Sequence, residues 1–367
     1  MKNIIKPSVL TLFICSILMV IGCSGDNKPD ASNENVNAQQ TFKWKLVTSW
    51  PKNFPGLGKA PETFAQYVNE MSNGRLQVTV YGAGELVPAF EVFNSVSVGS
   101  AEMGHAGAYY WKGKIPAAPI FSAIPFGMNA NEMNAWLHYG GGIELWRELY
   151  QPFGVIPFAG GNSGAQMAGW FRKEINSIED IQGLKMRIPG LGGEVFKKVG
   201  GLPVTLSGGE IFTSLQSGAI DATEWVGPYN DLTFGLHKAT TIYYHTPWHE
   251  PGTLLEFIVN QEAYEALPKD LQKIVEVATR AVNQDMLDEY TARNHASMIQ
   301  LVQDHGVKVM SLPTDVIQAL KIATKEVLAN ESAENDDFAR IYAEYSKFYE
   351  SVKNYHDLSE KDYYNNR

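Results

Sequence analysis

The sequence predicts an α/β fold of two lobes that ends in a long helical region. Strand-like and helix-like patterns alternate through residues 42–106, which is typical of a mostly parallel sheet covered by helices. About 325 residues follow the N-terminal segment, more than one hydrophobic core usually holds, so two lobes are expected. A helical pattern then continues without proline from residue 269 to residue 303.

The first residues have the pattern of an export signal. Lys2 and Lys6 precede an apolar run from Val9 to Ile21. The run is shorter than the roughly 20 residues that span a bilayer, but it has the length of a signal-peptide core. Because it ends just before Cys23, we interpret residues 1–22 as a lipoprotein signal peptide and Cys23 as the lipidated residue. The alternatives are an ordinary signal peptide with a chance cysteine and a lone transmembrane anchor.

Residues 23–40 contain almost no large apolar side chain, so we expect a flexible tether there. The chain's two cysteines, Cys15 and Cys23, both precede the folded part. That part is therefore expected to lack disulfides, thiol nucleophiles and thiolate metal sites. The formal net charge of −10 argues against nucleic acid and anionic lipid surfaces as partners. Attachment to a membrane would then depend on the lipid anchor alone.

The first lobe is expected to span about residues 41–153, with a segment near 254–310 returning to it. Alternation of apolar and polar residues, or a short buried run, predicts its strands, and helical spacing predicts its helices. The strands are expected at 42–48, 76–80 and 103–106, and the helices at 57–71, 87–98 and 129–150, the last with a break at three glycines.

The second lobe is expected to span about residues 154–252 and to include the C-terminal helices, with Val155 beginning it. Its strands are expected near 167–171, 185–188 and 204–206, and its helices at 193–199 and 210–216. The strand at 254–259 would return the chain to the first lobe.

The C-terminal region is expected to consist of helices at 267–303, 314–328 and 337–355, a strand at 307–310 and a frayed polar tail at 356–367. Apolar residues recur at three- and four-residue steps along the last helix, and such a stripe must be buried. It packs either against its own lobe or against a second copy of the chain, so a homodimer is a hypothesis. The stripe consists of Phe338, Ile341, Tyr342, Tyr345, Phe348, Tyr349 and Val352.

A run of motifs between residues 183 and 225 resembles a known family. The motifs are Gly183-Leu-Lys-Met-Arg-Ile-Pro189, Gly200-Gly-Leu-Pro-Val204, Glu210-Ile211, Ser214-Leu-Gln-Ser-Gly218 and Asp221-Ala-Thr-Glu-Trp225. Together they resemble the solute-binding proteins of TRAP (tripartite ATP-independent periplasmic) transporters, and residues 42–355 fit throughout. Ala222 is a mild departure, since many members have glycine there.

Within that family the chain looks most like the branch that binds 2-oxo acids and lactate. The features of that branch are Gln166, the pair Glu224-Trp225 and the segment Trp248-His-Glu-Pro251. The resemblance implies a periplasmic binding protein-like fold over residues 41–355, with a hinged ligand cleft. It also implies a receptor in the periplasm or at the cell surface, not an enzyme. This receptor would deliver a pyruvate-like 2-oxo monocarboxylate or lactate to a sodium-coupled membrane permease.

Arg187 is the candidate for binding the ligand's carboxylate. It lies in an apolar strand before Pro189, and a guanidinium matches a carboxylate with two parallel hydrogen bonds. The residues alone equally allow an arginine paired with a core carboxylate or extended to water. The resemblance implies the ligand role.

The resemblance also implies one metal ion beside Arg187. Its ligands would be the Gln166 amide oxygen, the Trp225 carbonyl and the carboxylates of Glu224 and Glu250, with Gln166 and Trp225 also contacting the substrate. Without the family, two surface acids would be the simpler interpretation. An all-oxygen set suits a hard cation, Na⁺ or Ca²⁺, and we slightly favour Na⁺.

Tyr109 is a further candidate for contacting the substrate, since it follows a strand end and ligands bind beyond such ends. We prefer it to Tyr110, and Trp50, Trp170 and Tyr229 are weaker candidates. A catalytic zinc site at residues 245–250 is disfavoured because Pro247 breaks any helix there. The remaining alternatives are a metal-dependent secreted hydrolase or lyase and a chemosensory ligand-binding protein.

Overall fold

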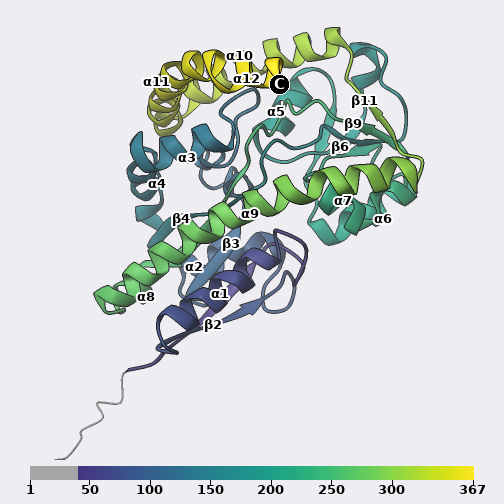
Figure 1. Ribbon diagram of the computed structural model, residues 1–367. Coiled ribbons are helices and arrows are strands. Elements are labelled where there is room, and N and C mark those ends of the chain that lie inside the picture. Colours follow the sequence, from purple (N-terminus) through teal and green to yellow (C-terminus); the bar gives the residue numbers. More distant parts are fainter. Residues whose placement is uncertain (1–39) are drawn as a thin grey trace, which may run out of the picture. The chain divides into compact units, whose positions relative to one another are not determined.

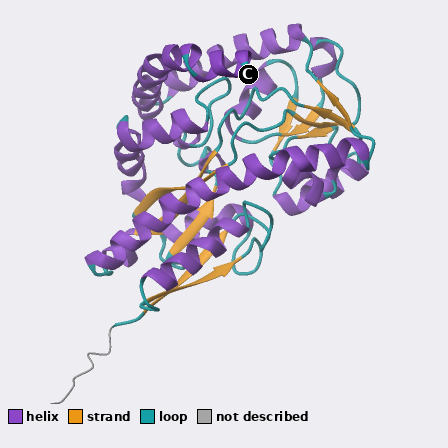
Figure 2. Cartoon of the chain, in the orientation of Figure 1, coloured by secondary structure: helices purple, strands orange, loops and turns teal. Residues whose placement is uncertain are grey.

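The computed structural model describes residues 40–367 (Figure 1). The predicted signal peptide, Cys23 and the tether up to residue 39 lie outside the described residues. Among residues 40–367, no helix combines the length and the apolar character needed to cross a membrane. The strands of the described part form two separate sheets (Figure 2).

The first sheet has the strand order β2-β1-β3-β10-β4. Its strands are β1 (Phe42–Thr48), β2 (Leu76–Tyr81), β3 (Met103–Ala106), β4 (Val155–Asn162) and β10 (Leu254–Asn260). The first three run parallel, and β10 lies antiparallel between β3 and β4. This pairing places β10 beside the strands that we expected in the first lobe.

The centre of this sheet is covered on both faces, so β3 and most of β10 are buried runs without alternation. Gly104 in β3 shows how closely the layers approach. A Cβ atom at Gly104 would lie 2.6 Å from the Val92 side chain and 3.1 Å from that of Ile258. Only glycine lets the helix α2 (Val92–Ser97) pack directly on the sheet here.

The second sheet has the strand order β11-β9-β5-β8-β6-β7. Its strands are β5 (Gly169–Phe171), β6 (Lys185–Arg187), β7 (Leu202–Val204), β8 (Ala222–Thr223), β9 (Ile242–Tyr244) and β11 (Lys308–Met310). These strands have two or three residues each. Strands this short hold little periodic signal, and the sequence prediction missed β8 and β9.

Two strands join a different sheet from the one that our lobe assignment implied. We expected Val155 to begin the second lobe, but β4 pairs along its length with β10 in the first sheet. We also placed residues up to 310 with the first lobe, but β11 pairs with β9 in the second sheet. Local patterns predict that a strand exists, whereas its sheet depends on distant partners.

The helices α1 (Lys59–Met71), α2 (Val92–Ser97), α4 (Gly142–Tyr150) and α8 (Gln261–Glu265) contact the first sheet or its neighbours, and α3 (Ala130–Tyr139) packs on α4. The helices α5 (Gly190–Lys198) and α6 (Gly208–Ser217) contact strands of the second sheet. Short 3-10 helices form many connections: η1 (Ala89–Glu91), η2 (Ala108–Trp111), η3 (Ala118–Phe121), η4 (Gln151–Phe153), η5 (Ile178–Ile181) and η6 (Leu236–Lys238).

The helix α9 (Lys269–Gln303) joins the two halves of the described part. It contacts β4 and α1 on the side of the first sheet and α7 (Pro228–Phe234) on the side of the second sheet (Figure 1). A helix of 35 residues is about 50 Å long, enough to pack along both lobes.

The C-terminal helices α10 (Thr314–Glu334), α11 (Asp336–Leu358) and α12 (Glu360–Asn366) follow. In the stripe of α11, Phe338, Ile341 and Tyr345 are buried against the chain's own core. Of the two possibilities for the stripe, packing on its own chain accounts for these residues. The polar tail is helical in the structure, since α11 and α12 extend to Asn366. Within the tail, Lys361 pairs with Asp357, one helical turn earlier.

Candidate functional site

Four segments, one strand end and three loops, bring the predicted site residues together. Arg187 ends β6, Glu224 follows β8, Gln166 lies between β4 and β5, and Glu250 precedes β10. Backbone hydrogen bonds connect these segments in pairs: Gln166 N donates to Glu250 O at 3.0 Å, and Glu224 N donates to Arg187 O at 3.2 Å. All four side chains are buried, with at most 5% of each residue exposed.

Arg187 is fully engaged within the protein. Its Nη1 donates to the carboxylate of Glu224, and its Nε donates to the Leu206 carbonyl at 3.2 Å. Its Nη2 donates to the Tyr110 hydroxyl at 3.2 Å, and its guanidinium lies 5.2 Å from the Trp225 ring centroid. This is the arginine–carboxylate pair that the residues alone had allowed.

The charge state of Arg187 follows from this pairing. Burial is the largest influence on the pKa of Arg187 and acts to lower it, but the Glu224 carboxylate and the other acidic groups nearby together outweigh burial and raise the pKa. The guanidinium therefore stays charged. Removing either partner would leave an uncompensated buried charge, which is far more costly than losing an exposed ion pair.

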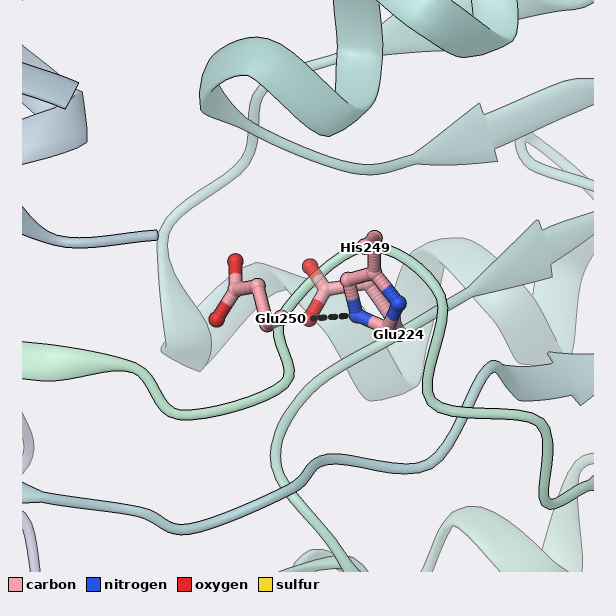
Figure 3. A group of neighbouring side chains, drawn as sticks. All are labelled: Glu224, His249 and Glu250. Carbon is pink, nitrogen blue, oxygen red and sulfur yellow. Dashed lines mark ion pairs between the residues drawn. The ribbon is translucent and has the colours of Figure 1, made fainter. Parts of the chain in front are cut away.

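Glu224 and Glu250 lie beside each other together with His249 (Figure 3). One ligand atom of each residue lies within 4.8 Å of those of the other two. Burial, together with the neighbouring Glu224 carboxylate, raises the pKa of Glu250 to about 7. The Thr253 hydroxyl donates a hydrogen bond to Glu250, which partly opposes this shift. Two buried acids at this distance need a cation or a proton between them.

His249 is a residue of this cluster that sequence reasoning missed. Its Nε2 lies 3.6 Å from a Glu224 carboxylate oxygen, and neither of its ring nitrogens makes a hydrogen bond. We named His249 as part of the segment Trp248-His-Glu-Pro251 and considered it for a zinc site, but we gave it no role beside the two carboxylates. A loop can place a side chain in a site without helical spacing. The position of His249 directly before Glu250 in the sequence could have indicated that it lies in the site.

Gln166 supplies a polar atom without a partner. Its Nε2 donates to Ser163 Oγ at 3.0 Å, whereas its Oε1 is buried and accepts no hydrogen bond. An unsatisfied buried oxygen costs free energy unless something binds it. An amide oxygen and two carboxylates are ligands that Na⁺ and Ca²⁺ prefer, so the residues present fit a hard cation.

The first lobe contributes the 3-10 helix η2 to the site. We preferred Tyr109, but the hydroxyl that contacts Arg187 is that of Tyr110. Tyr109 packs edge-on against Tyr110 with ring centroids 4.6 Å apart. Both tyrosines line a groove of about 570 Å³ whose opposite wall is α5 and β7. Lys112 crosses this groove to pair with Glu194 at 3.3 Å.

The weaker aromatic candidates have other contacts. Trp50 packs edge-on against Trp225 at 6.0 Å, so it supports the wall behind Arg187. Trp170 donates to Asp231 at 2.9 Å, and the Tyr229 hydroxyl donates to Glu289 at 3.1 Å.

Asp231 supports the loop that holds Glu224 and Trp225. Its Oδ1 accepts a hydrogen bond from Val226 N at 3.4 Å, and its Oδ2 accepts from Trp170 and from the Tyr243 hydroxyl at 2.6 Å. Burial raises the pKa of Asp231 to about 7, although these hydrogen bonds oppose the shift. The loop is therefore held by buried polar contacts beneath it.

Comparison with known proteins shows the same architecture. The model of the DctP family, bacterial extracellular solute-binding protein family 7, matches residues 46–335. The monocarboxylate 2-oxoacid-binding periplasmic protein of Nostoc sp. (strain PCC 7120) is 41% identical over 323 residues, 88% of each chain.

Two solved structures are similar over the same region. One is a TRAP periplasmic solute-binding protein from Colwellia psychrerythraea with bound calcium and pyruvate. It is 43% identical with a TM-score of 0.87, covering 89% of this chain and 100% of that one. The other, from Pseudoalteromonas atlantica T6c, has bound sodium and pyruvate. It is 42% identical with a TM-score of 0.86, covering 89% and 99%.

These similarities confirm the expected two-lobed fold of a periplasmic binding protein. The family consists of transport proteins that bind solutes outside the cytoplasm, which decides against a hydrolase or lyase. The resemblance inferred from the motifs at residues 183–225 is confirmed as well. The chain belongs to the DctP family, family 7 of the bacterial extracellular solute-binding proteins.

Proposed function

We propose that this protein is the receptor of a TRAP transporter, which binds a 2-oxo monocarboxylate such as pyruvate, or lactate, and delivers it to a membrane permease. The observation that carries the proposal is the buried cluster itself. A charged arginine lies beside two carboxylates and an amide oxygen without a partner. The bound pyruvate of two relatives that are 42–43% identical supports the same ligand class.

One Na⁺ or Ca²⁺ ion belongs to the proposed site, as in those two relatives. Gln166, Glu224, Glu250 and the Trp225 carbonyl would hold it. When bound, the ion supplies positive charge that offsets the two carboxylates and offers a coordination position to the ligand. His249 has nitrogen donors, which hard cations disfavour, so its proposed role is to orient Glu224.

Arg187 is proposed to exchange partners when the ligand binds. The Arg187–Glu224 pair keeps both charges satisfied when neither ion nor ligand is present. If Glu224 turns toward a cation, the guanidinium becomes free to donate two parallel hydrogen bonds to the ligand's carboxylate. Cation and ligand would then bind with positive coupling. The cation would compensate the Glu224 carboxylate, and the ligand would compensate the Arg187 guanidinium that Glu224 had released.

The arrangement would distinguish 2-oxo and 2-hydroxy acids from simple carboxylates. A 2-oxo acid has a carboxylate oxygen and a keto oxygen on adjacent carbons, and lactate has a hydroxyl in that position. Both can coordinate one cation through two oxygens, whereas propionate cannot do so in this way. Arg187 would recognise the charge, and the ion would recognise the 2-position.

The test is calorimetry on protein freed of calcium by chelation and of sodium by dialysis. Pyruvate affinity should fall in the ion-free protein and return when Na⁺ or Ca²⁺ is restored, with propionate weak throughout. Coupling of this kind is typically about 1–3 kcal/mol. Glu224→Gln and Glu250→Gln should weaken binding and remove its dependence on the ion. Glu344→Gln on the surface is the control. Unchanged affinity without ions, or equal affinity for propionate, would contradict the metal-assisted mechanism.

Two finer features are also proposed. Lipid on Cys23 would hold the receptor at the outer face of a membrane, with residues 23–40 as its tether.

A homodimer would use the end of α11 and α12, where Tyr355, Leu358, Tyr363 and Tyr364 are exposed. A monomer mass at micromolar concentration in light scattering would remove the dimer.

A further inference from the structure

Glu256 is a buried acid that the proposed binding mechanism leaves unused. It lies on β10, the strand between β3 and β4, and is fully buried. Its Oε1 accepts a hydrogen bond from Trp111 Nε1, and its Oε2 accepts one from the Tyr150 hydroxyl at 3.0 Å. Among residues 40–367, no lysine, arginine or histidine forms an ion pair with it. A buried carboxyl group in a structural core is costly, so its position calls for a physical reason.

The contacts of Glu256 lead directly to the ligand site. Trp111 is the last residue of η2, and the residue before it is Tyr110. The Tyr110 hydroxyl accepts a hydrogen bond from Arg187 Nη2 at 3.2 Å. The 3-10 helix η2 has only four residues and its N-cap makes no side-chain hydrogen bond, so its own backbone gives little rigidity. The indole of Trp111 is its polar anchor in the core.

We propose that Glu256 is a positioning residue for ligand binding, which acts through Trp111 to hold η2 so that the Tyr110 hydroxyl reaches Arg187. Glu256 touches neither the ligand nor the ion. Because Glu256 lies on the central strand β10, its hydrogen bond with the Trp111 indole fixes η2 relative to the first sheet. This inference rests on the proposed function, since it concerns how the first lobe presents Tyr110 to the arginine.

The environment of Glu256 is consistent with a neutral anchor. Burial raises the pKa of Glu256 to about 8, although the hydrogen bonds from Trp111 and Tyr150 oppose the shift. A neutral carboxyl group can accept the hydrogen bond from Trp111 at its carbonyl oxygen. Its O–H group can share a hydrogen bond with the Tyr150 hydroxyl, and no charge is buried. Glutamine has the same shape and an oxygen acceptor, whereas leucine has neither donor nor acceptor.

The test compares Glu256→Leu with Glu256→Gln. Leucine should weaken pyruvate binding about tenfold, a coupling of the size found between contacting residues. Glutamine should recover most of that affinity. Tyr345→Phe removes another buried hydroxyl, which accepts a hydrogen bond from Met128 N at 2.7 Å, and is the control for a loss of stability alone. If Glu256→Leu binds pyruvate as the wild type does, the proposal is overturned. If Glu256→Leu fails to fold, Trp111→Phe removes the same hydrogen bond by deleting its donor, and it should weaken pyruvate binding in the same way.

A double-mutant cycle separates positioning from general destabilisation. In a Tyr110→Phe background, Glu256→Leu should cost little further affinity, because the hydroxyl that it positions is already absent. Equal losses in both backgrounds would overturn the proposal. The NMR resonances of the Trp111 indole N–H and the Tyr110 ring should both shift in ligand-free Glu256→Leu. If the wild type binds neither pyruvate nor lactate, the proposed function fails, and these shifts still decide the role of Glu256.

Discussion

At the scale of single residues, the site is a set of charges that satisfy one another before any ligand arrives. Arg187 contacts Glu224, Leu206 and Tyr110, so its guanidinium already has hydrogen-bond partners in the absence of a bound anion. Burial and the neighbouring Glu224 carboxylate raise the pKa of Glu250 to about 7, so near neutral pH Glu250 is close to losing or gaining a proton. Such a balance lets a cation change the partners of all three side chains.

Substitution of Arg187 should abolish tight binding. Truncating one partner of a desolvated charge pair costs roughly 2–5 kcal/mol, so Arg187→Ala should lose pyruvate while remaining folded. Arg187→Lys should also bind poorly, since an ammonium cannot replace the bonds to Leu206, Glu224 and Tyr110 together. Calorimetry measures both variants, and the half-exposed Arg340, changed to alanine, is the control. Near-normal affinity of Arg187→Ala would remove Arg187 from the site.

Glu256 should make the stability of the protein depend on pH. The folded-state pKa is about 8, above the ordinary value of 4.5. Between these values the folded chain retains a proton that the unfolded chain releases. The free energy of unfolding should therefore fall as pH rises from about 4.5 to about 8, by at most about 1.4 kcal/mol per pH unit from this group. The fall should end above pH 8.

Glu256→Gln removes the titration and should flatten this part of the profile. Denaturant unfolding at pH 5, 7 and 9 measures the difference between wild type and variant. We expect glutamine to be relatively more stabilising at pH 9 than at pH 5. A difference that does not change with pH would show that Glu256 is not a buried neutral acid.

At the scale of elements, α7 and α9 form a buried contact with the first lobe. Asn230 in α7 donates from Nδ2 to the Pro55 carbonyl at 3.0 Å. The Tyr290 hydroxyl in α9 donates to Asn230 Oδ1 at 2.9 Å. Asn230 and Tyr290 are buried. Asn230 thus connects Pro55 of the first lobe with Tyr290 of α9. Its hydrogen bond to Pro55 would have to break if the lobes separate.

Asn230→Ala should therefore favour an open form. Each lost hydrogen bond contributes about 1 kcal/mol, so ligand dissociation should accelerate about fivefold or more. Stopped-flow measurement of the dissociation rate checks this expectation. Thr233→Ala on the same helix removes only a local hydrogen bond to the Tyr229 carbonyl and should leave the rate unchanged. An unchanged rate in Asn230→Ala would mean that this contact persists when the ligand leaves.

The division into lobes is itself a proposal at this scale. The pairing of β4 with β10 and of β11 with β9 suggests that the chain crosses between lobes after Asn162, again before Leu254, and along α9. The crossing at residues 163–169 and 245–253 places Gln166 and Glu250 at the junction. Residues at a junction can change their mutual distance when lobes open and close.

At the scale of the whole molecule, the described part is expected to act at the end of an anchored tether. If Cys23 is lipidated, Cys23→Ser should release the protein from membranes without changing its ligand affinity, because the site lies wholly within residues 109–250. Fractionation and the mass of the mature N-terminus measure this. A Cys23→Ser protein that still sediments with membranes, or an unmodified wild-type N-terminus, would contradict the lipoprotein interpretation.

Local patterns predicted much of the fold. β1 and β3 begin and end where their patterns indicated, and α3 begins at Ala130, one residue after the expected start of a helix at 129. Most other predicted elements were correct within a few residues. The motifs at residues 183–225 identified the family, and those at 166, 224–225 and 250 led to residues that the fold brings together. These successes share a cause, since helix spacing, strand alternation and motif order are all properties of neighbouring residues.

The sequence by itself therefore determined the class of fold, the family and the chemical types available for a site. Only the tertiary structure decided that β4 joins the first sheet, that Arg187 pairs with Glu224, and that Tyr110 rather than Tyr109 contacts the guanidinium. It also brought Glu256 beneath Trp111, from residues 145 positions away. Each of these outcomes depends on which distant segments share a buried interface, and burial, hydrogen bonding and charge compensation act between neighbours in space rather than in sequence.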